Sequence, residues 1–484
     1  MRKGVHFIIL LLILFSSCID KDVYQGEEET DNGDGNGNST EYVRYLYPYG
    51  AEAQDVVAEI TIETNGGISW EDVEVEIPFL KYNKSWLFML TQDDFSHSSY
   101  STTWAAINGR PLSNDYFYNA EQLAAGDLPP HASYLGKTLG STDGAGKEVR
   151  FHFTATVAPE MNWMDAEVSV NKGFSDNNYR FQMMRGLTWN NLSEMLAYGT
   201  GIAFHDVNTK DADNAASILQ HYEISQQILL EKLSGRGCKT LAEPNGNKAY
   251  VRAALDYAPL QIMTAQNDGG GEFELESLYP FKVNSDLHKG LLQRYFYDSP
   301  FDIVPRIEAQ LRKDKVEREA VHFGVHRTGI TFAQFLLWLN NRYGKDGDDS
   351  VWFPSLEEYY EYNYYRVNAT IEKEVNGNTV TLRVSLPSEQ YFYYPSITIN
   401  LPGVKEEQIK SVTSGNEVTG LSYANYNDGL MLNIDCRKFL AEHALYFVEK
   451  YESSRSQADK NDALYFTNML KEAPEKFQLL ERIK

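Results

Sequence analysis

The segment Trp86-Leu87-Phe88-Met89-Leu90-Thr91-Gln92-Asp93-Asp94-Phe95 begins as an apolar run and ends in two adjacent carboxylates. A short apolar run of this kind is typical of a buried strand. Like charges held close together raise one pKa unless a cation or a proton lies between them. The pair Asp93 and Asp94 therefore indicates a metal site or a general base, although Asp is also common in the turn after a strand.

Strand-like and helix-like segments alternate from about residue 85 to residue 366. The expected strands include 151–157, 201–204 and 320–326, and the expected helices include 188–198, 215–233 and 332–343. Such alternation predicts parallel strands with helices outside them, and sites at the C-terminal ends of the strands. Asp93 and Asp94 lie at such an end.

The chain on either side of this region has strand patterns alone. Segments 57–63 and 73–77 alternate polar and apolar residues around Asn65-Gly66-Gly67, which predicts an N-terminal β-hairpin. After residue 366, short strands separated by turns such as Asn376-Gly377-Asn378 predict a small β-sandwich. The last stretch, 458–484, predicts one or two helices.

The N-terminus has the layout of an export signal. Arg2 and Lys3 precede the apolar run Val5 to Phe15, which is too short to span a bilayer and fits a signal peptide. Phe15-Ser16-Ser17-Cys18 resembles a bacterial lipobox, so Cys18 is the expected lipidation site of an outer-membrane lipoprotein at the cell surface. The polar segment 24–42 has little to bury and predicts a flexible tether.

We therefore expect six parts. They are a signal peptide (1–17), a tether (18–42), a β-hairpin cap (43–84), a (β/α) barrel (85–366), a β-sandwich (367–450) and a helical segment (451–484). The net charge of −24 argues against nucleic acid as a partner, because phosphates require a positive surface. Cys238 and Cys436 either pair or stay as free thiols.

Several motifs occur in an order that matches one family. The strand ending in Asp93-Asp94 is followed by the helix 188–195, by Gly201-Ile202-Ala203-Phe204-His205, by Glu243-Pro244-Asn245-Gly246, and by a late strand that carries histidines. Over about residues 81–366 this order resembles the polysaccharide deacetylase family, the NodB homology domain of carbohydrate esterase family four. The resemblance implies an irregular (β/α) barrel that removes acetyl groups from poly- or oligosaccharides with a divalent metal, often zinc.

The resemblance also implies roles for individual residues. Asp93 corresponds to the base that deprotonates water, and Asp94 and His205 correspond to metal ligands. The histidine that protonates the leaving group is His326 or His322, which share one strand face. We prefer His326 because it is nearer the C-terminal end of its strand.

The groove around these residues has further candidates. Pro244 and Gly246 keep part of the family's Arg-x-Pro-x-Gly loop, and Trp352 in the closing segment 351–362 is an expected substrate contact. The loop has Ala242 where the family has arginine, so Arg252 or another residue would have to orient the base.

The family's second metal-binding histidine falls on Thr209, which leaves Asp94 and His205 as two ligands. The site is completed by another residue or is free of metal. The candidates to complete it are Asp206, Asp211, Asp213 and His221. The first functional hypothesis is a metal-dependent carbohydrate deacetylase at the cell surface. The alternatives are a degenerate deacetylase fold that binds glycans for carbohydrate uptake, and a structural surface lipoprotein.

Overall fold

The computed structural model describes residues 55–171, 178–182 and 186–484. The expected signal peptide (1–17), the tether (18–42) and the lipidation site Cys18 lie outside these residues. Within the described ranges, no helix combines the length and the apolar character needed to cross a membrane.

The central element is a nine-stranded sheet in which all paired strands are parallel. Its strands are β2 (Trp86–Gln92), β5 (Thr154–Val157), β6 (Gly201–Phe204), β7 (Thr240–Ala242), β8 (Ile262–Ala265), β9 (Leu291–Gln293), β10 (Tyr295–Phe296), β11 (Val321–Val325) and β12 (Val351–Trp352). The order is β10-β11-β2-β5-β6-β7-β8-β9, with β12 also paired to β2. Since β9 and β10 stand at the two ends of this order and only Arg294 separates them in sequence, the sheet is nearly closed. This confirms the expected (β/α) barrel.

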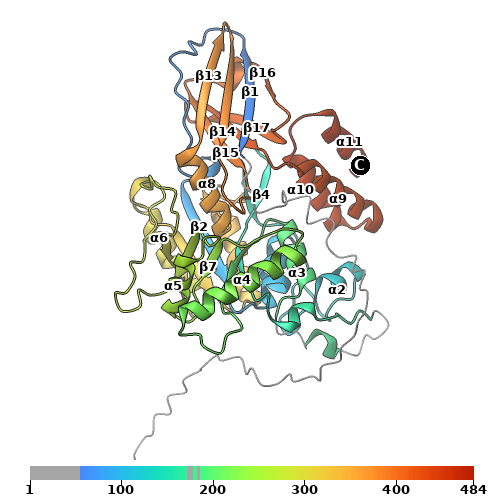
Figure 1. Cartoon of the computed structure of the whole chain (residues 1–484). Coiled ribbons are helices and arrows are strands. Elements are labelled where there is room, and N and C mark those ends of the chain that lie inside the picture. Colours follow the sequence, from blue (N-terminus) through green and yellow to red (C-terminus); the bar gives the residue numbers. More distant parts are fainter. Residues whose placement is uncertain (1–54, 172–177, 183–185) are drawn as a thin grey trace, which may run out of the picture. The chain divides into compact units, whose positions relative to one another are not determined.

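Helices cover the outside of the barrel (Figure 1). The α-helices of this region are α1 (Ala105–Ile107), α2 (Ala120–Ala125), α3 (Trp189–Ala197), α4 (Ala215–Lys232), α5 (Lys248–Asp256), α6 (Val304–Leu311), α7 (Ile330–Tyr343) and α8 (Leu356–Asn368). Helix α3 begins where the sequence predicts, because the Thr188 side chain accepts a hydrogen bond from the backbone N–H of Asn191.

Short elements complete the barrel region and its connections. They are the hairpin strands β3 (Gly140–Thr142) and β4 (Glu148–Arg150), the π-helix η3 (Ser99–Trp104), and the 3-10 helices η2 (Lys81–Asn83), η4 (Asn162–Asp165), η5 (Asn178–Phe181), η6 (Pro300–Ile303), η7 (Lys315–Glu317) and η8 (Glu406–Gln408). Cys238 and Cys436 are buried free thiols.

A β-sandwich follows the barrel, and it includes a strand from the N-terminal region. One sheet has the order β13-β14-β1-β16 and the other has the order β15-β18-β17. The strands are β1 (Val56–Thr64), β13 (Thr370–Asn376), β14 (Thr379–Leu386), β15 (Ser396–Pro402), β16 (Ile409–Ser414), β17 (Gly420–Tyr426) and β18 (Gly429–Asp435). Inward side chains of both sheets, such as Ile60 and Leu432, belong to one buried cluster.

The prediction of an N-terminal β-hairpin is wrong. Strand β1 pairs antiparallel with β14 and β16, whereas residues 73–77 contribute only the single bridge between Glu76 and Asn400. The alternation identified the buried face of β1 correctly but did not specify its partner strand.

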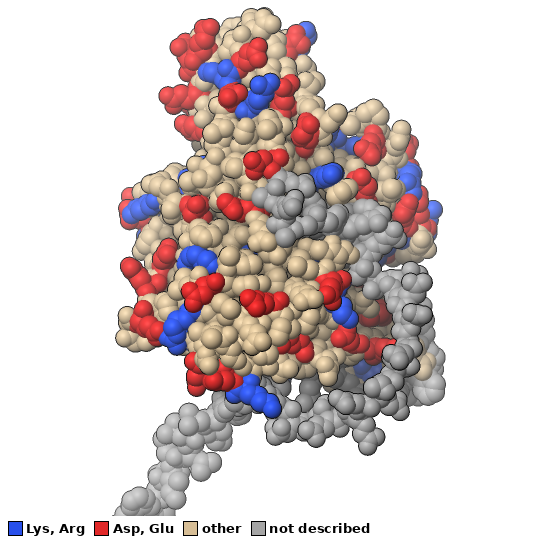
Figure 2. Space-filling view, viewed as in Figure 1, with Lys and Arg blue, Asp and Glu red and all other residues tan. Residues whose placement is uncertain are grey.

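Figure 2 shows acidic and basic side chains next to one another on the outer surface of the sandwich. Lys410 Nζ of β16 lies 2.6 Å from Glu63 Oε1 of β1.

The C-terminal helices are α9 (Leu440–Ser454), α10 (Gln457–Met469) and α11 (Pro474–Ile483), which pack against one another (Figure 1). The last sandwich strand ends at Asp435, so residues 440–450 belong to α9 and not to the expected sandwich. The helical segment is therefore longer than the sequence predicted.

Candidate active site

The strand β2 ends in a sharp turn that places Asp93 and Asp94 at the rim of the barrel. Asp93 continues the strand, because its N–H donates to the carbonyl oxygen of Val325 at 2.7 Å. Asp94 (φ 60°) and Phe95 (φ 51°) both lie in the left-handed region, which is costly for residues other than glycine. The turn is held by the Phe95 N–H, which donates to Thr156 Oγ1 at 3.1 Å. The backbone N–H of Phe95 is therefore already paired with Thr156.

Asp93 forms a buried ion pair with an arginine that the sequence did not identify. Arg294 Nη1 lies 2.6 Å from Asp93 Oδ1, and both residues are at most 2% exposed. Arg294 Nη2 also donates to the backbone carbonyl of Glu243 at 2.6 Å. Arg294 thus supplies the cation that Ala242 lacks. Arg252 does not, because it pairs with Glu272 at the surface.

A second buried ion pair lies next to Arg294. Lys248 Nζ contacts Glu243 Oε1, and neither side chain is more than 5% exposed. Burial raises the pKa of Glu243, despite the opposing effect of Lys248. The Glu243-Pro244 turn therefore contributes a carboxylate as well as a backbone shape to this end of the barrel.

His205 follows β6 and points toward Asp94. Its Nδ1 lies 2.7 Å from the carbonyl oxygen of Ala242, so Nδ1 carries a proton and donates it. Its Nε2 lies 3.6 Å from Asp94 Oδ1. Burial lowers the pKa of His205, but the negative charge of Asp93 and the nearby Asp94 carboxylate outweigh burial and leave the pKa raised. The ring is therefore protonated over a wider pH range than a free histidine.

The pKa of Asp94 is shifted in the opposite direction to that of His205. Burial raises the pKa of Asp94, but the nearby His205 ring, together with His326 and Arg327, outweighs burial. The net shift is downward, so Asp94 is held as a carboxylate.

The two histidines that are candidates for the general acid have different surroundings. His322 lies in β11, and His326 directly follows it. His326 is exposed at the rim, and its backbone carbonyl accepts from Gln92 Nε2 at 3.0 Å. His322 is 1% exposed inside the barrel, where its Nε2 lies 2.7 Å from Thr91 Oγ1. Burial lowers the pKa of His322 to about 3. Of the two, His326 is the histidine whose charge acts on Asp94.

The turn after β7 lies at the same end of the barrel. Pro244 is buried, and its carbonyl accepts from the N–H of Asn247, which caps α5. Gly246 has φ 73°, and an added Cβ would lie 2.5 Å from Asn267 Nδ2. Glycine is therefore favoured here by its backbone conformation, and a larger residue would also displace the Asn267 side chain.

Trp352 lies away from this rim, which corrects the expectation that it contacts substrate. Its backbone pairs with Leu87 near the start of β2, whereas Asp93 follows the end of that strand. The Trp352 ring is 3% exposed and packs against Tyr359 and Tyr362. Trp352 is a core residue between the barrel and the sandwich.

Asp94 and His205 converge, but no third metal ligand among the described residues joins them. The other candidates have different partners or are exposed: Asp206 accepts from the Tyr250 hydroxyl, His221 pairs with Glu160 at 2.5 Å, Asp211 accepts from Asn214 at 3.3 Å, and Asp213 is exposed. In the described ranges, no group of three or more His, Cys, Asp or Glu side chains is placed to hold a metal ion. The donors present do not fit a catalytic zinc, which keeps three protein ligands.

Carboxylates and an imidazole at the C-terminal strand ends of a (β/α) barrel are the arrangement of barrel enzymes. Residues 58–484 match the family model described as "Putative polysaccharide deacetylase". The chain therefore belongs to the polysaccharide deacetylase family, and its function is deacetylase-like and directed at carbohydrate. The match extends beyond the barrel and includes the sandwich and the C-terminal helices. A search of curated proteins finds no match.

Proposed function

We propose that this chain hydrolyses acetyl groups on a carbohydrate at the rim formed by Asp93, Asp94, His205 and His326. The observation that carries the proposal is the ion pair of Asp93 and Arg294, which holds the Asp93 carboxylate in one orientation. The oriented carboxylate of Asp93 can act as the base, and the imidazole of His205 can stabilise negative charge.

The proposed reaction begins when Asp93 accepts a proton from water and the water oxygen attacks the acetyl carbonyl carbon. Negative charge develops on the carbonyl oxygen, and His205, whose raised pKa favours the imidazolium form, stabilises that charge. The bond from the acetyl carbon to the sugar oxygen or nitrogen then breaks, and His326 gives a proton to the leaving group. The products are acetate and a free hydroxyl or amine.

Metal dependence stays a prediction that rests on the family resemblance. Asp94 and His205 are two donors, and the described residues do not supply a third, so no step above passes through a metal. Zinc, cobalt or nickel added to chelator-treated protein tests the prediction directly. A rise in acetate release would support it.

The test of the proposed reaction is acetate release from N- and O-acetylated oligosaccharides. Asp93→Asn should lower the rate by about 10²- to 10⁴-fold, because the general base is lost. Asp428→Asn, in an exposed turn of the sandwich, is the matched control and should leave the rate unchanged. Equal rates in wild type and Asp93→Asn would overturn the proposal, as would no release with or without added metal.

A second candidate function is glycan capture without hydrolysis. The two-donor arrangement favours it, since Thr209 replaces a metal-binding histidine that the family uses at this site. Calorimetric binding of an acetylated oligosaccharide that is unaffected by chelator, with no acetate released, would favour this function over hydrolysis.

We also propose that Cys18 is lipidated and anchors the protein to the outer membrane at the cell surface. The lipobox-like segment before Cys18 supports this. Metabolic labelling with a fatty acid should mark the wild type and not Cys18→Ser, and the labelled protein should be accessible to protease added to intact cells.

A further inference from the structure

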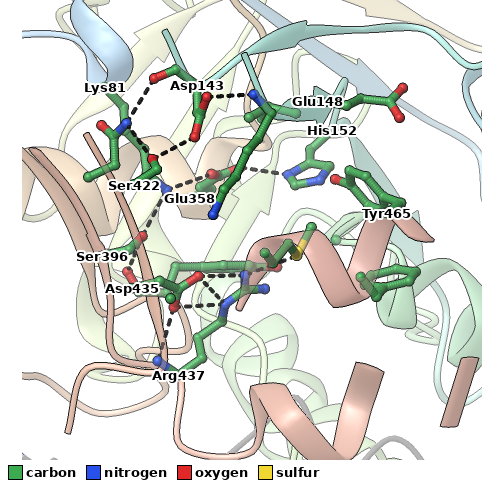
Figure 3. Close-up of a pocket in the computed structure, with 18 of the residues that line it drawn as sticks. Lys81, Asp143, Glu148, His152, Glu358, Ser396, Ser422, Asp435, Arg437 and Tyr465 are labelled. Atoms are coloured by element: carbon green, nitrogen blue, oxygen red, sulfur yellow. Dashed lines mark hydrogen bonds and ion pairs between the residues drawn. The ribbon is translucent and has the colours of Figure 1, made fainter. Parts of the chain in front are cut away.

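A cavity of about 100 Å³, lined by charged and aromatic side chains, lies at the end of the barrel opposite to Asp93 (Figure 3). Its barrel residues, such as Lys81 and His152, precede the strands β2 and β5, whereas Asp93 follows β2. The seven residues of β2 span roughly 20 Å. The cavity is therefore separate from the site proposed for hydrolysis.

Three parts of the protein meet at the cavity. The barrel region contributes Lys81 and His152. The sandwich contributes Ser422 of β17, and the C-terminal helices contribute Tyr465 and Met469 of α10. Binding pockets often occur where such units meet.

Charged side chains around the cavity are held in place by one another. His152 Nδ1 lies 2.8 Å from Glu358 Oε2, and Glu358 Oε1 lies 3.4 Å from Lys81 Nζ. Arg437 Nη2 lies 2.6 Å from Asp435 Oδ2 on the opposite wall. Figure 3 shows these pairs around the same hollow. A ligand would thus meet polar groups whose orientation is already fixed, which reduces the entropic cost of binding.

Charged side chains of both signs line the cavity. Its acidic side chains are Asp143, Glu148, Glu358 and Asp435, and its basic or imidazole side chains are Lys81, Lys147, His152 and Arg437. A simple anion or cation would meet groups of its own sign as well as opposite ones. A neutral molecule with several hydroxyls suits this lining, because each hydroxyl can donate to a carboxylate and accept from an ammonium or guanidinium.

The size and the apolar part of the lining narrow the ligand further. Tyr465 of α10 contributes an aromatic ring to the lining, against which the C–H groups of a polyol can pack, whereas the Phe466 ring already stacks on Phe447. An apolar cavity of about 150 Å³ admits a benzene molecule. The present cavity is smaller, so it fits a short polyol or part of one sugar ring.

We propose that this cavity is a second carbohydrate site, which takes one neutral polyhydroxylated unit between the barrel, the sandwich and α10. The proposal does not depend on hydrolysis at Asp93. It assigns Arg437 and Glu358 to hydrogen bonding with the hydroxyls, and Tyr465 to packing against the ring.

Saturation-transfer NMR on the full chain with glucose, glycerol and inorganic phosphate tests the proposal. Glucose or glycerol should bind the wild type and phosphate should not. Arg437→Lys, which keeps the charge but loses the planar fork, should weaken binding by about tenfold. Met469→Trp, which fills the cavity, should abolish it. Arg383→Lys in the exposed pair with Glu59 and Asp93→Asn should leave binding unchanged.

Four results would overturn the proposal: no binding of either polyol, equal or stronger binding of phosphate, unchanged binding in folded Arg437→Lys and Met469→Trp, or loss of binding in Asp93→Asn. The last result would place the sugar at the rim near Asp93. A crystal soaked in glucose gives an answer that needs no variant. Density for the sugar next to Arg437 is expected, and a cavity that holds only water would contradict the proposal.

Discussion

Arg294 Nη1 lies 2.6 Å from Asp93 Oδ1, although the two residues are 201 positions apart in the sequence. Arg294 is the single residue between β9 and β10, the two strands at the ends of the barrel order. The residue at the place where the barrel closes therefore also holds the candidate base. Closure of the barrel and orientation of the base are linked through one side chain.

Arg294→Met should destabilise the protein by about 3–5 kcal/mol, because it leaves Asp93 buried without a counter-charge. Urea unfolding at neutral pH measures this change. Arg252→Met is the matched control, since its pair with Glu272 is exposed, and it should cost about 0–1 kcal/mol.

The double variant Arg294→Met with Asp93→Asn distinguishes the pair from a general effect of the Arg294 side chain. It should be less destabilised than the sum of the single variants, because the neutral Asn no longer needs the guanidinium. Strict additivity would show that the two side chains do not interact energetically.

Much of the rim could be predicted because its residues lie next to strand ends. Asp93, Asp94, His205 and His326 each follow a buried strand that the apolar pattern identifies, and the parallel order brings these ends to one side. Arg294 could not be predicted in this way. Its role depends on which strands close the barrel, and a lone arginine between two very short strands carries no local pattern.

The sandwich shows the same limit. The alternation over residues 379–386 is typical of a half-buried strand, and β14 forms over these residues. The alternation of β1 was equally clear, but it is satisfied by any partner that covers the same face. The true partners, β14 and β16, lie more than 300 residues later, and a local hairpin was the wrong choice.

The position of β1 between β14 and β16 makes it a central strand of the sandwich. Ile60→Ala should therefore cost about 2–5 kcal/mol, since the side chain is fully buried between the sheets. Val57→Ala, on the outer face of the same strand at 47% exposure, should change stability by about 0.5 kcal/mol or less. Equal and small losses in urea unfolding would argue that β1 is dispensable.

Thr209→His tests whether the family's second histidine can be restored at its position. Thr209 Oγ1 lies 2.7 Å from Ser217 Oγ at the start of α4, so its side chain is committed to that helix. We expect zinc affinity, measured by calorimetry, to stay at the wild-type level. Stability should fall by about 0.5–1.5 kcal/mol for the lost hydrogen bond.

His205→Ala serves as the comparison for that experiment. If wild-type protein binds zinc, His205→Ala should weaken it, because His205 and Asp94 are the converging donors. A large gain of zinc affinity in Thr209→His would contradict the expectation, and it would mean that the segment after His205 can turn its side chains toward Asp94.

Glu358 should make the protein acid-sensitive. Burial raises the pKa of Glu358, but the charges of His152 and Lys81 outweigh it and lower the pKa to about 2. Because the pKa is lower in the folded than in the unfolded state, the ionised group stabilises the fold above about pH 4.5, by about 3 kcal/mol. That contribution is lost as the pH falls from about 4.5 toward 2. Urea unfolding at a series of pH values measures the slope.

Glu358→Gln should remove the part of the pH dependence of stability that comes from Glu358. The difference in the free energy of unfolding between this variant and the wild type should therefore be largest near neutral pH and smaller in acid. The exposed Glu59→Gln is the control, since its pair with Arg383 at 3.5 Å lies in solvent and should give a small offset at every pH. A difference between Glu358→Gln and wild type that stays constant from neutral pH to about pH 3 would contradict the lowered pKa, because a carboxyl group that titrates normally in both states adds no pH-dependent stability.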